Sequence, residues 1–483
     1  MQSVVSANAE TIETHVVIIG GGGAGMAAAV AAAEKGAHVV VLEKLRNLGG
    51  NSARAEGLLA AESPAQKRLK IDAQRDEIFN IAMSYAHWKT NARIVRAFVD
   101  KSGDTIQWLE NKGLYFDWVP HYYPNQLIRT WHCLKGRGME LIDVLVRDCE
   151  KYGVRILRET GAKKLLTDDK GNIAGVLALT VNKDLVIKAK SVIIATGGYG
   201  GNRKLLKKYY PQLNKNMVCV GVPNTGDGIL MATEIGAATE GLGLLHFCGH
   251  SALKAPEFIR ATGEEPNSIW VNNRGERFMN EAIGFNHFES INGIIRQPDN
   301  VCFSLFDDRI RKNLIEKGVI KGLGCVVPPG TKLTTLDQQF KIAVKRGTAH
   351  EADSWEGIAQ WIGAEPGTLI NTINEYNAFC DKGQDTLFTK DRKYLDALRI
   401  PPYYALKCYP AFLGTIGGIR INEKMEVLNH QYYSIPGIYA AGIDTGGWEA
   451  DTYNAVLSGT TFGFAVSSGR IAGENAADYI LGK

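Results

Sequence analysis

The 483-residue sequence has few cysteines and none of the spacings typical of a metal, haem or iron–sulfur site. Its eight cysteines are scattered with no C-x-x-C pair, at positions 133, 149, 219, 248, 302, 325, 380 and 408. Without C-x-x-C-H there is no c-type haem attachment site, and without clustered cysteines no iron–sulfur cluster is expected. We expect reduced thiols and no bound metal, so electrons for any redox chemistry must come from outside the chain.

A strong charge of either sign and a long hydrophobic run are also missing. Lys and Arg number 55 and Asp and Glu 51, for a formal net charge of +4 without a long block of like charge. This balance gives no reason to expect a nucleic-acid partner. No apolar run reaches membrane-spanning length, and residues 1–14 have neither the basic nor the apolar region of a secretory signal. We expect a soluble, cytoplasmic protein.

Residues 15–44 carry a nucleotide-binding pattern, HVVIIGGGGAGMAAAVAAAEKGAHVVVLEK. An apolar run enters a glycine turn, an alanine-rich segment of helical length follows, and a second apolar run ends in Glu43. Gly20, Gly22 and Gly25 fit G-x-G-x-x-G, in which the first glycine permits the tight turn, the second the approach of a pyrophosphate and the third close helix–strand packing. The pattern predicts a strand, turn, helix and strand that bind a dinucleotide, with its pyrophosphate at the helix N-terminus and its ribose on Glu43.

The following segment indicates which dinucleotide is bound. LGGNS at 48–52 and AEG at 55–57 resemble the FAD-binding segment of the fumarate reductase/succinate dehydrogenase flavoprotein family, which includes the 3-ketosteroid dehydrogenases. Further matches in the family's order are SVIIATGG (191–198), NTGDGI (224–229), VNNRGERFMNE (271–281), IPGIYAAG (435–442) and SGTTFG (458–463). The resemblance is nearest to ene-reductase-like soluble members.

The resemblance implies a set of FAD contacts. The covalent members of the family carry a histidine in the glycine-rich segment after the acid, and here that segment is GGNS, so the FAD should be non-covalent. Ser458 and Gly459 should begin a helix that points its first amides at the N1/O2 edge of the flavin. The implied contacts are Gly20, Gly22, Gly23, Ala24, Gly25, Glu43, Lys44, Gly49, Gly50, Asn51, Ser52, Glu56, Gly57, Ala195, Thr196, Gly197, Asn224, Asp227, Gly442, Asp444, Ser458, Gly459 and Thr460.

The expected fold is α/β. A chain of this length suggests two or three domains, and the resemblance implies a Rossmann-type, glutathione-reductase-like FAD-binding domain formed by 1–244 and 411–483. An α+β capping domain would be inserted at 245–410. Apolar spacing predicts amphipathic helices at 94–112 and 138–152, and short alternating runs predict a β-meander within 154–190.

The departures from the family pattern concern the substrate. Fumarate reductases place a proton-donating arginine four or five residues after the N-E pair, where this chain has Phe285 and Asn286. Their carboxylate-binding histidine falls in the segment LGTIGG at 413–418, and their second arginine falls at Tyr453. Without these clamps a buried dicarboxylate would lose roughly 2–5 kcal/mol per partner, which disfavours fumarate.

Aromatic and neutral residues replace the clamps and suggest an apolar substrate. Candidate catalytic residues are Tyr453, as a proton donor, His287 and Asn286; a plain packing role for Tyr453 stays open. Single histidines are also commonly structural, although a histidine with a pKa near neutral could relay a proton. Candidate substrate contacts are Phe285, Trp448, Tyr122, Tyr123 and His246.

These observations predict an FAD-dependent oxidoreductase acting on CH–CH bonds. Hydride would pass from flavin N5 to an activated C=C or ring carbon of a neutral polycyclic substrate, such as a steroid, a bile-acid-like compound or an isoflavonoid like tetrahydrodaidzein. The alternatives are a 3-ketosteroid-type dehydrogenase and a fumarate-type reductase with unrecognised carboxylate clamps. A flavin oxidase and a non-enzymatic electron-carrier subunit are more distant possibilities. The electron donor would be NAD(P)H or a reduced carrier.

Overall fold

The computed structural model describes residues 10–483 except 123–125, 127, 182, 252–254 and 325, and its chain divides into two compact units. The first unit is built from the chain up to Gln212 together with Gly221–His246 and Leu413–Lys483, and the second from Leu213–Val220 and Phe247–Phe412. The predicted capping segment, 245–410, therefore lies almost wholly in the second unit, and its capping role stays a prediction. Two strands cross the unit boundaries, β12 (Thr239–Ser251) and β16 (Tyr403–Ile419).

A six-stranded sheet forms the centre of the first unit. Neighbouring strands are parallel except for the edge pair β17–β18. The runs VVII and VVVL in β2 and β3 are buried along their whole length, as expected for parallel strands covered on both faces. In sheet order the strands are β17 (Glu426–Leu428), β18 (Ser434–Ala440), β10 (Ser191–Ile194), β2 (Val16–Ile19), β3 (Val39–Leu42) and β6 (Arg155–Leu157).

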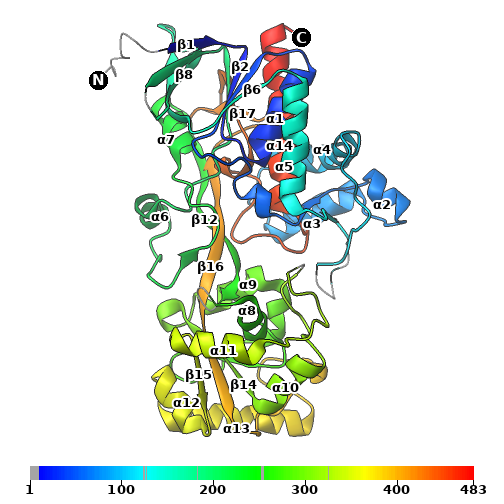
Figure 1. Ribbon diagram of the computed structural model, residues 1–483, viewed down its shortest axis with the longest axis vertical. Helices are drawn as coiled ribbons and strands as arrows, with labels where there is room; N and C mark the ends of the chain where they lie inside the picture. The colour runs from blue at the N-terminus through cyan, green and yellow to red at the C-terminus, as the bar shows by residue number, and fades with distance from the viewer. Residues whose placement is uncertain (1–9, 123–125, 127, 182, 252–254, 325) are drawn as a thin grey trace. The chain divides into compact units, whose positions relative to one another are not determined.

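Three helices of the first unit pack together, with the first and last helices of the chain in direct contact (Figure 1). Ideal Cβ atoms built on Gly469 and Gly473 would lie 2.2 Å from Ala24 O and 2.3 Å from Ala28 O. Glycine is therefore required where the two backbones cross. The three helices are α1 (Gly23–Glu34), α5 (Arg137–Lys151) and α14 (Thr460–Leu481).

The other elements of the first unit confirm most of the local predictions. The helices expected at 94–112 and 138–152 are α4 (Ala92–Glu110) and α5. The expected meander is formed by β7 (Gly161–Thr167), β8 (Ile173–Leu179) and β9 (Asp184–Lys188), which β1 (Glu10–Glu13) joins. Residues 155–157, counted with that meander, instead form β6 at the edge of the central sheet, because this short strand aligns parallel with β3. The remaining elements are β4 (Gly57–Leu59), β5 (Trp131–Cys133), α2 (Pro64–Arg68), α3 (Arg75–Tyr85), α6 (Arg203–Tyr209) and α7 (Asp227–Glu234).

The second unit is an α+β body around β16. A buried ion network ties its elements together: Arg277 contacts Glu281 at 2.7 Å and Asp385 at 2.8 Å, and Lys390 Nζ lies 3.1 Å from Glu281. Its strands are β11 (Val218–Cys219), β13 (Ile269–Val271), β14 (Cys302–Asp307) and β15 (Ala349–Ala352). Its helices are α8 (Glu257–Gly263), α9 (His287–Ile294), α10 (Asp308–Glu316), α11 (Leu336–Lys345), α12 (Trp355–Ile362) and α13 (Pro366–Lys382).

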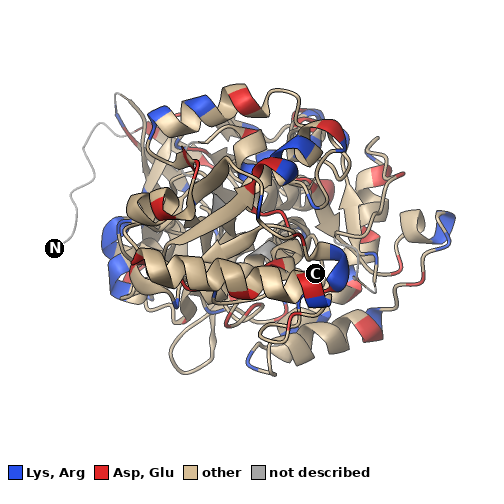
Figure 2. Ribbon diagram, turned by 90° about the horizontal axis from the view of Figure 1, so that it is seen from below, with Lys and Arg blue, Asp and Glu red and all other residues tan. Residues whose placement is uncertain are grey.

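The distribution of charged residues over the helices agrees with the nearly balanced charge of the sequence. Basic and acidic residues both occur along the helices (Figure 2). Over the described part of the chain, every helix is too short or too polar to cross a bilayer. The seven cysteines that are described are free thiols.

Candidate active site

A cavity in the first unit opens at the carboxyl ends of β2, β3 and β10. Ile19 and Leu42 end two of these strands, Ala195 follows the third, and all three residues line the cavity. In open α/β sheets ligands bind at this edge, because the loops that leave the parallel strands diverge there. The cavity therefore lies where the glycine pattern predicts a dinucleotide.

The three motif glycines lie in different surroundings. Gly20 has a φ of +110°, and an ideal Cβ on it would lie 2.2 Å from Ala195 O; a Cβ on Gly25 would lie 1.9 Å from Gly20 O. Both glycines are thus needed for the turn and for helix–strand packing. A Cβ on Gly22 would meet no protein atom nearer than Gly49 O at 3.8 Å. Gly22 also caps α1 and faces the cavity, so its missing side chain leaves the space that a pyrophosphate needs.

Glu43 and Lys44 line the cavity beside this turn. The Glu43 carboxylate accepts hydrogen bonds from Gly21 N and Leu45 N, each at 2.8 Å, which fixes its orientation and leaves lone pairs for ribose hydroxyls. Lys44 Nζ donates to Thr225 Oγ1 at 2.7 Å and pairs with Asp227 at 3.0 Å. The Glu43 carboxylate is therefore preorganised for a sugar.

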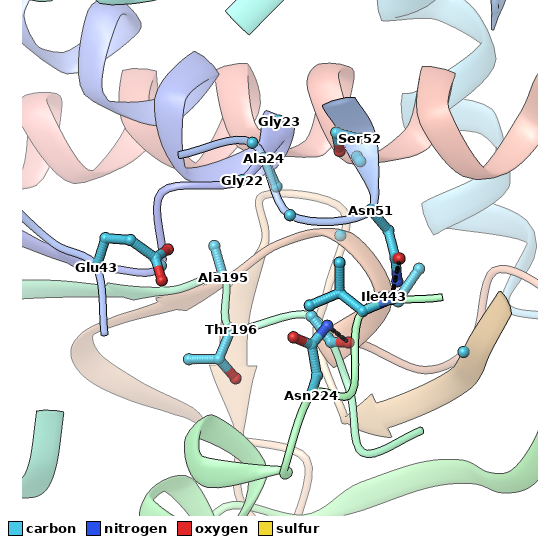
Figure 3. Close-up of a pocket in the computed structure, with 18 of the residues that line it drawn as sticks. Gly22, Gly23, Ala24, Glu43, Asn51, Ser52, Ala195, Thr196, Asn224 and Ile443 are labelled. Carbon is cyan, nitrogen blue, oxygen red and sulfur yellow. Dashed lines mark hydrogen bonds between the residues drawn. The ribbon is translucent and has the colours of Figure 1, made fainter. Parts of the chain in front are cut away.

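The segment 49–52 forms a second glycine turn against the first, and its Asn51 and Ser52 are labelled in Figure 3. Gly49 and Gly50 have positive φ values of +106° and +50°, and Gly49 N donates to Gly21 O at 2.8 Å. Asn51 connects this turn to two other segments, because its Oδ1 accepts from Val222 N at 2.6 Å and its Nδ2 donates to Leu413 O at 3.3 Å. The Asn51 side chain thus fixes three lining segments together.

Asp444 acts on the cavity through a neighbouring turn and is not among the lining residues. Its buried carboxylate accepts hydrogen bonds from the amides of Thr196, Gly197 and Gly198 and from the Thr196 hydroxyl. Thr196 and Gly197 do line the cavity. Burial raises the pKa of the Asp444 carboxyl, and the four donors oppose that shift. Asn224, another lining residue, donates to Gly197 O at 2.6 Å (Figure 3).

The start of α14 reaches the cavity with residues that the sequence reasoning missed. The predicted contacts Ser458, Gly459 and Thr460 lie just before or at the helix start and do not line the cavity, whereas Thr461 and Phe462 do. Ala465 also lines it, and the spacing 461, 462, 465 is one face of an α-helix. That periodicity was visible in the sequence and could have identified them.

His246 and Tyr453 form a neutral aromatic pair, of which His246 lines the cavity and Tyr453 does not. The His246 ring centroid lies 4.2 Å from that of the buried Tyr453. Thr461 N donates to the Tyr453 hydroxyl at 3.4 Å. Burial lowers the pKa of His246 to about 3 and raises the pKa of Tyr453. At neutral pH the imidazole is uncharged and the phenol keeps its proton.

Glu449 adds a buried carboxyl close to Tyr453 in sequence. The residue is only 7% exposed, and its charge would raise the pKa of Tyr453 further. Burial raises the pKa of Glu449 to about 8, and a hydrogen bond with the Asn454 backbone opposes this shift. The carboxyl is thus largely protonated at pH 7, and the surroundings of Tyr453 stay neutral.

The other predicted substrate and catalytic residues are distributed over both units. Trp448 is buried against Phe464, with ring centroids 4.3 Å apart, so it packs on α14 and does not line the cavity. Tyr122 packs edge-on against Trp131. Phe285 and Asn286 belong to the second unit, where Asn286 caps α9 by accepting from Glu289 N. Tyr123 and the side chain of His287 lie outside the described residues.

Most of the predicted cofactor contacts nevertheless come together at one cavity. Gly25, Glu56, Gly57, Asp444, Ser458, Gly459 and Thr460 are not among its lining residues. Those that line it are Gly20, Gly22, Gly23, Ala24, Glu43, Lys44, Gly49, Gly50, Asn51, Ser52, Ala195, Thr196, Gly197, Asn224, Asp227 and Gly442.

Comparisons with known proteins agree with this geometry. A vinyl phenol reductase from Lactiplantibacillus plantarum is 33% identical over 480 residues, covering 96% of each chain. A probable fumarate reductase, Ifc3, from Shewanella frigidimarina is 29% identical, covering 97% of this chain and 76% of its own. The structure of the open conformation of a flavocytochrome c3 fumarate reductase superposes with a TM-score of 0.77 at 28% identity, covering 98% of this chain and 79% of that one.

These similarities establish the class of enzyme and its cofactor. The chain is an FAD-dependent oxidoreductase acting on CH–CH bonds, with an α/β, Rossmann-type FAD-binding fold. The family model described as an FAD binding domain matches residues 15–458. The chain therefore belongs to the FAD binding domain family of the fumarate reductase and 3-ketosteroid dehydrogenase flavoproteins.

Proposed function

We propose that this protein is a flavin-dependent reductase that saturates the activated C=C bond of a neutral, ring-bearing substrate. The observation that carries the proposal is the neutral pair formed by His246, which lines the cavity, and Tyr453, which packs against the His246 ring. Gly22–Ala24 would hold the pyrophosphate of FAD, Glu43 its ribose, and residues 49–52 with the start of α14 its ring system.

The absence of charge on His246 and Tyr453 disfavours a dicarboxylate substrate. Tyr453 stands where fumarate reductases carry an arginine, and it is buried with its proton retained. His246 has a pKa of about 3 because of its burial, so it offers no cation at neutral pH. A carboxylate bound beside the pair would lose water without gaining a charged partner from it, whereas an apolar ring would stack on His246.

Tyr453 is the proton donor in this proposal. Thr461 N donates to its hydroxyl oxygen, an arrangement that favours the phenolate left after proton transfer. When bound, reduced FAD supplies hydride from N5 to one alkene carbon. Tyr453 gives a proton to the other carbon, so the C=C π bond is replaced by two C–H bonds and water returns a proton to the tyrosine.

The similarity to vinyl phenol reductase supports a small aryl alkene as one such substrate. That relative matches over 96% of both chains, and the name describes a neutral ring next to a C=C bond. Steroid, bile-acid-like and isoflavonoid rings share the same neutral, apolar character. The electron donor in this proposal is NAD(P)H or a reduced carrier.

An anaerobic reoxidation assay tests the proposal. Holoenzyme reduced with dithionite would be mixed with 4-vinylphenol, androst-4-ene-3,17-dione, tetrahydrodaidzein or fumarate while flavin absorbance is followed. We expect at least one neutral compound, and not fumarate, to reoxidise the flavin. Reoxidation by fumarate alone would show that carboxylate-binding residues were overlooked.

A Tyr453→Phe variant tests the proton donor separately. Removing the hydroxyl should slow reoxidation by about 100-fold, in the range of a general acid, while FAD content is retained. Phe285→Leu changes another predicted contact without removing a proton donor and serves as the control. Equal rates in Y453F and the unmodified enzyme would exclude Tyr453 as the acid.

A further inference from the structure

The turn that precedes α14 is held by side chains from a distant part of the first unit. Gln126 is buried, with 4% of its surface exposed. Its Nε2 donates to Val456 O at 2.7 Å and to Ser458 Oγ at 3.0 Å. Its Oε1 accepts from Tyr122 N at 2.5 Å. One carboxamide thus connects Tyr122, which precedes β5 in the chain, to the residues just before α14.

Two more donors hold the same turn. Thr130 Oγ1 donates to Ser458 O at 3.0 Å, and Leu59 N donates to Gly459 O at 2.9 Å. Gly459 has a φ of +89°, and a Cβ on it would lie 2.5 Å from Leu59 N. The carbonyl oxygens of Val456, Ser458 and Gly459 therefore each accept a hydrogen bond from a different residue, although the turn is neither helix nor strand.

This turn determines where α14 begins. Gly459 is the N-cap of the helix, and the cavity-lining residues Thr461 and Phe462 lie in its first turn. The free amides of a helix N-terminus carry partial positive charge that favours an anion and falls off within about one turn. A small displacement of the helix start would therefore change the potential felt inside the cavity.

We propose that Gln126 is a positioning residue that holds the first amides of α14 against the flavin, so that they stabilise its reduced, anionic form. The proposal rests on the placement of FAD given under Proposed function. It does not depend on the identity of the alkene. Gln126 touches neither the reacting atoms nor the cavity, and it acts through the Val456–Gly459 turn.

The reduction potential of the flavin in substrate-free holoenzyme tests this role. Gln126→Leu removes the donors and the acceptor with little change in volume, and Thr130→Val removes a single donor to the same turn. Asn377→Leu is the matched control, because Asn377 is a buried carboxamide that also donates to and accepts from backbone, at Leu398 in the second unit.

We expect Q126L to retain FAD and to favour reduced over oxidised flavin about tenfold less than the unmodified enzyme. For a two-electron couple this equals a midpoint lower by about 30 mV. T130V should shift the potential in the same direction by less, and N377L should leave it unchanged. A purely structural role would lower thermal stability in Q126L and leave the potential where it was.

An unchanged potential in Q126L and T130V, or an equal shift in N377L, would overturn the proposal. If Q126L is isolated without FAD, T130V decides the question, because its change is nearly isosteric. The reoxidation assay is separate: a potential shift in an enzyme that reduces no neutral alkene would refute the substrate class and leave the role of Gln126 supported.

Discussion

The Asp444 carboxylate accepts a hydrogen bond from the Thr196 hydroxyl at 2.8 Å, and it also accepts from three successive amides of the same turn. Two residues far apart in sequence thereby fix a cavity wall. Asp444→Asn should weaken FAD binding about 10–100-fold, since an NH₂ group would face N–H donors and lose roughly 1–3 kcal/mol. FAD titration of apoprotein, followed by flavin fluorescence, measures the effect.

The matched control for Asp444→Asn is Asp381→Asn in the second unit. Asp381 pairs at the surface with Arg399, so removal of its charge should leave FAD affinity unchanged. A similar affinity in D444N and the unmodified protein would mean that the 196–198 turn holds its shape without the carboxylate.

Alanine substitutions at two motif glycines should have opposite consequences. Gly22→Ala places a methyl group in open cavity space, so the protein should fold normally and bind FAD at least about tenfold more weakly. Gly25→Ala places the methyl group 1.9 Å from Gly20 O, so unfolding free energy should fall by about 1–3 kcal/mol. Urea denaturation of apoprotein and FAD titration separate the two effects. Equal stability losses would refute the assignment of Gly22 to the cofactor.

Glu449 should make the protein less stable as pH rises. Its folded-state pKa of about 8 lies above the ordinary value of 4.5, so between these values the folded state binds more protons than the unfolded state. The contribution of Glu449 to the free energy of unfolding is therefore complete below about pH 4.5. It falls by on the order of 3–5 kcal/mol as the pH rises to 8.

Glu449→Gln keeps a neutral side chain at every pH. The difference in unfolding free energy between this variant and the unmodified protein should grow in favour of the variant from pH 5 to pH 8. Urea denaturation at three pH values measures it, and other titrating groups cancel in the difference. Parallel curves would show that the carboxyl is hydrated.

The buried ion network of the second unit should be sensitive to loss of one partner. Glu281→Gln leaves Arg277 and Lys390 with less compensating charge in a buried site, and this should cost about 3–5 kcal/mol of unfolding free energy. Chemical denaturation monitored by tryptophan fluorescence measures the loss. Asp381→Asn, which breaks an exposed pair, should produce no detectable change. A loss no larger than in D381N would mean that solvent reaches the network.

Sequence reasoning succeeded where the determinants were local. The glycine turn, the buried strands around it and the amphipathic helices α4 and α5 depend on residues close in sequence. The close approach of Gly25 to Gly20 O lies within the same local pattern. The fold class could therefore be predicted from a few segments.

The features of the candidate site that the sequence did not predict depend on contacts between segments far apart in the chain. Gln126 meets Val456 across 330 residues, and no periodicity in either segment indicates this contact. The family resemblance implied Asp444 as an FAD contact, but its hydrogen bonds to the 196–198 turn require the folded sheet. Thr461 was missed in favour of Thr460 because a one-residue shift in the start of α14 changes which side chains face the cavity.

The close crossing of α1 and α14 has a consequence for the protein's synthesis. On the ribosome, Gly469 and Gly473, on which α1 packs, emerge several hundred residues after the glycine turn. Strand β18, which pairs with β10, is also made late. At typical elongation rates of about 5–20 residues per second, the buried face of α1 stays without its native partner for tens of seconds. The first unit therefore completes its helix packing only after α14 has left the ribosome.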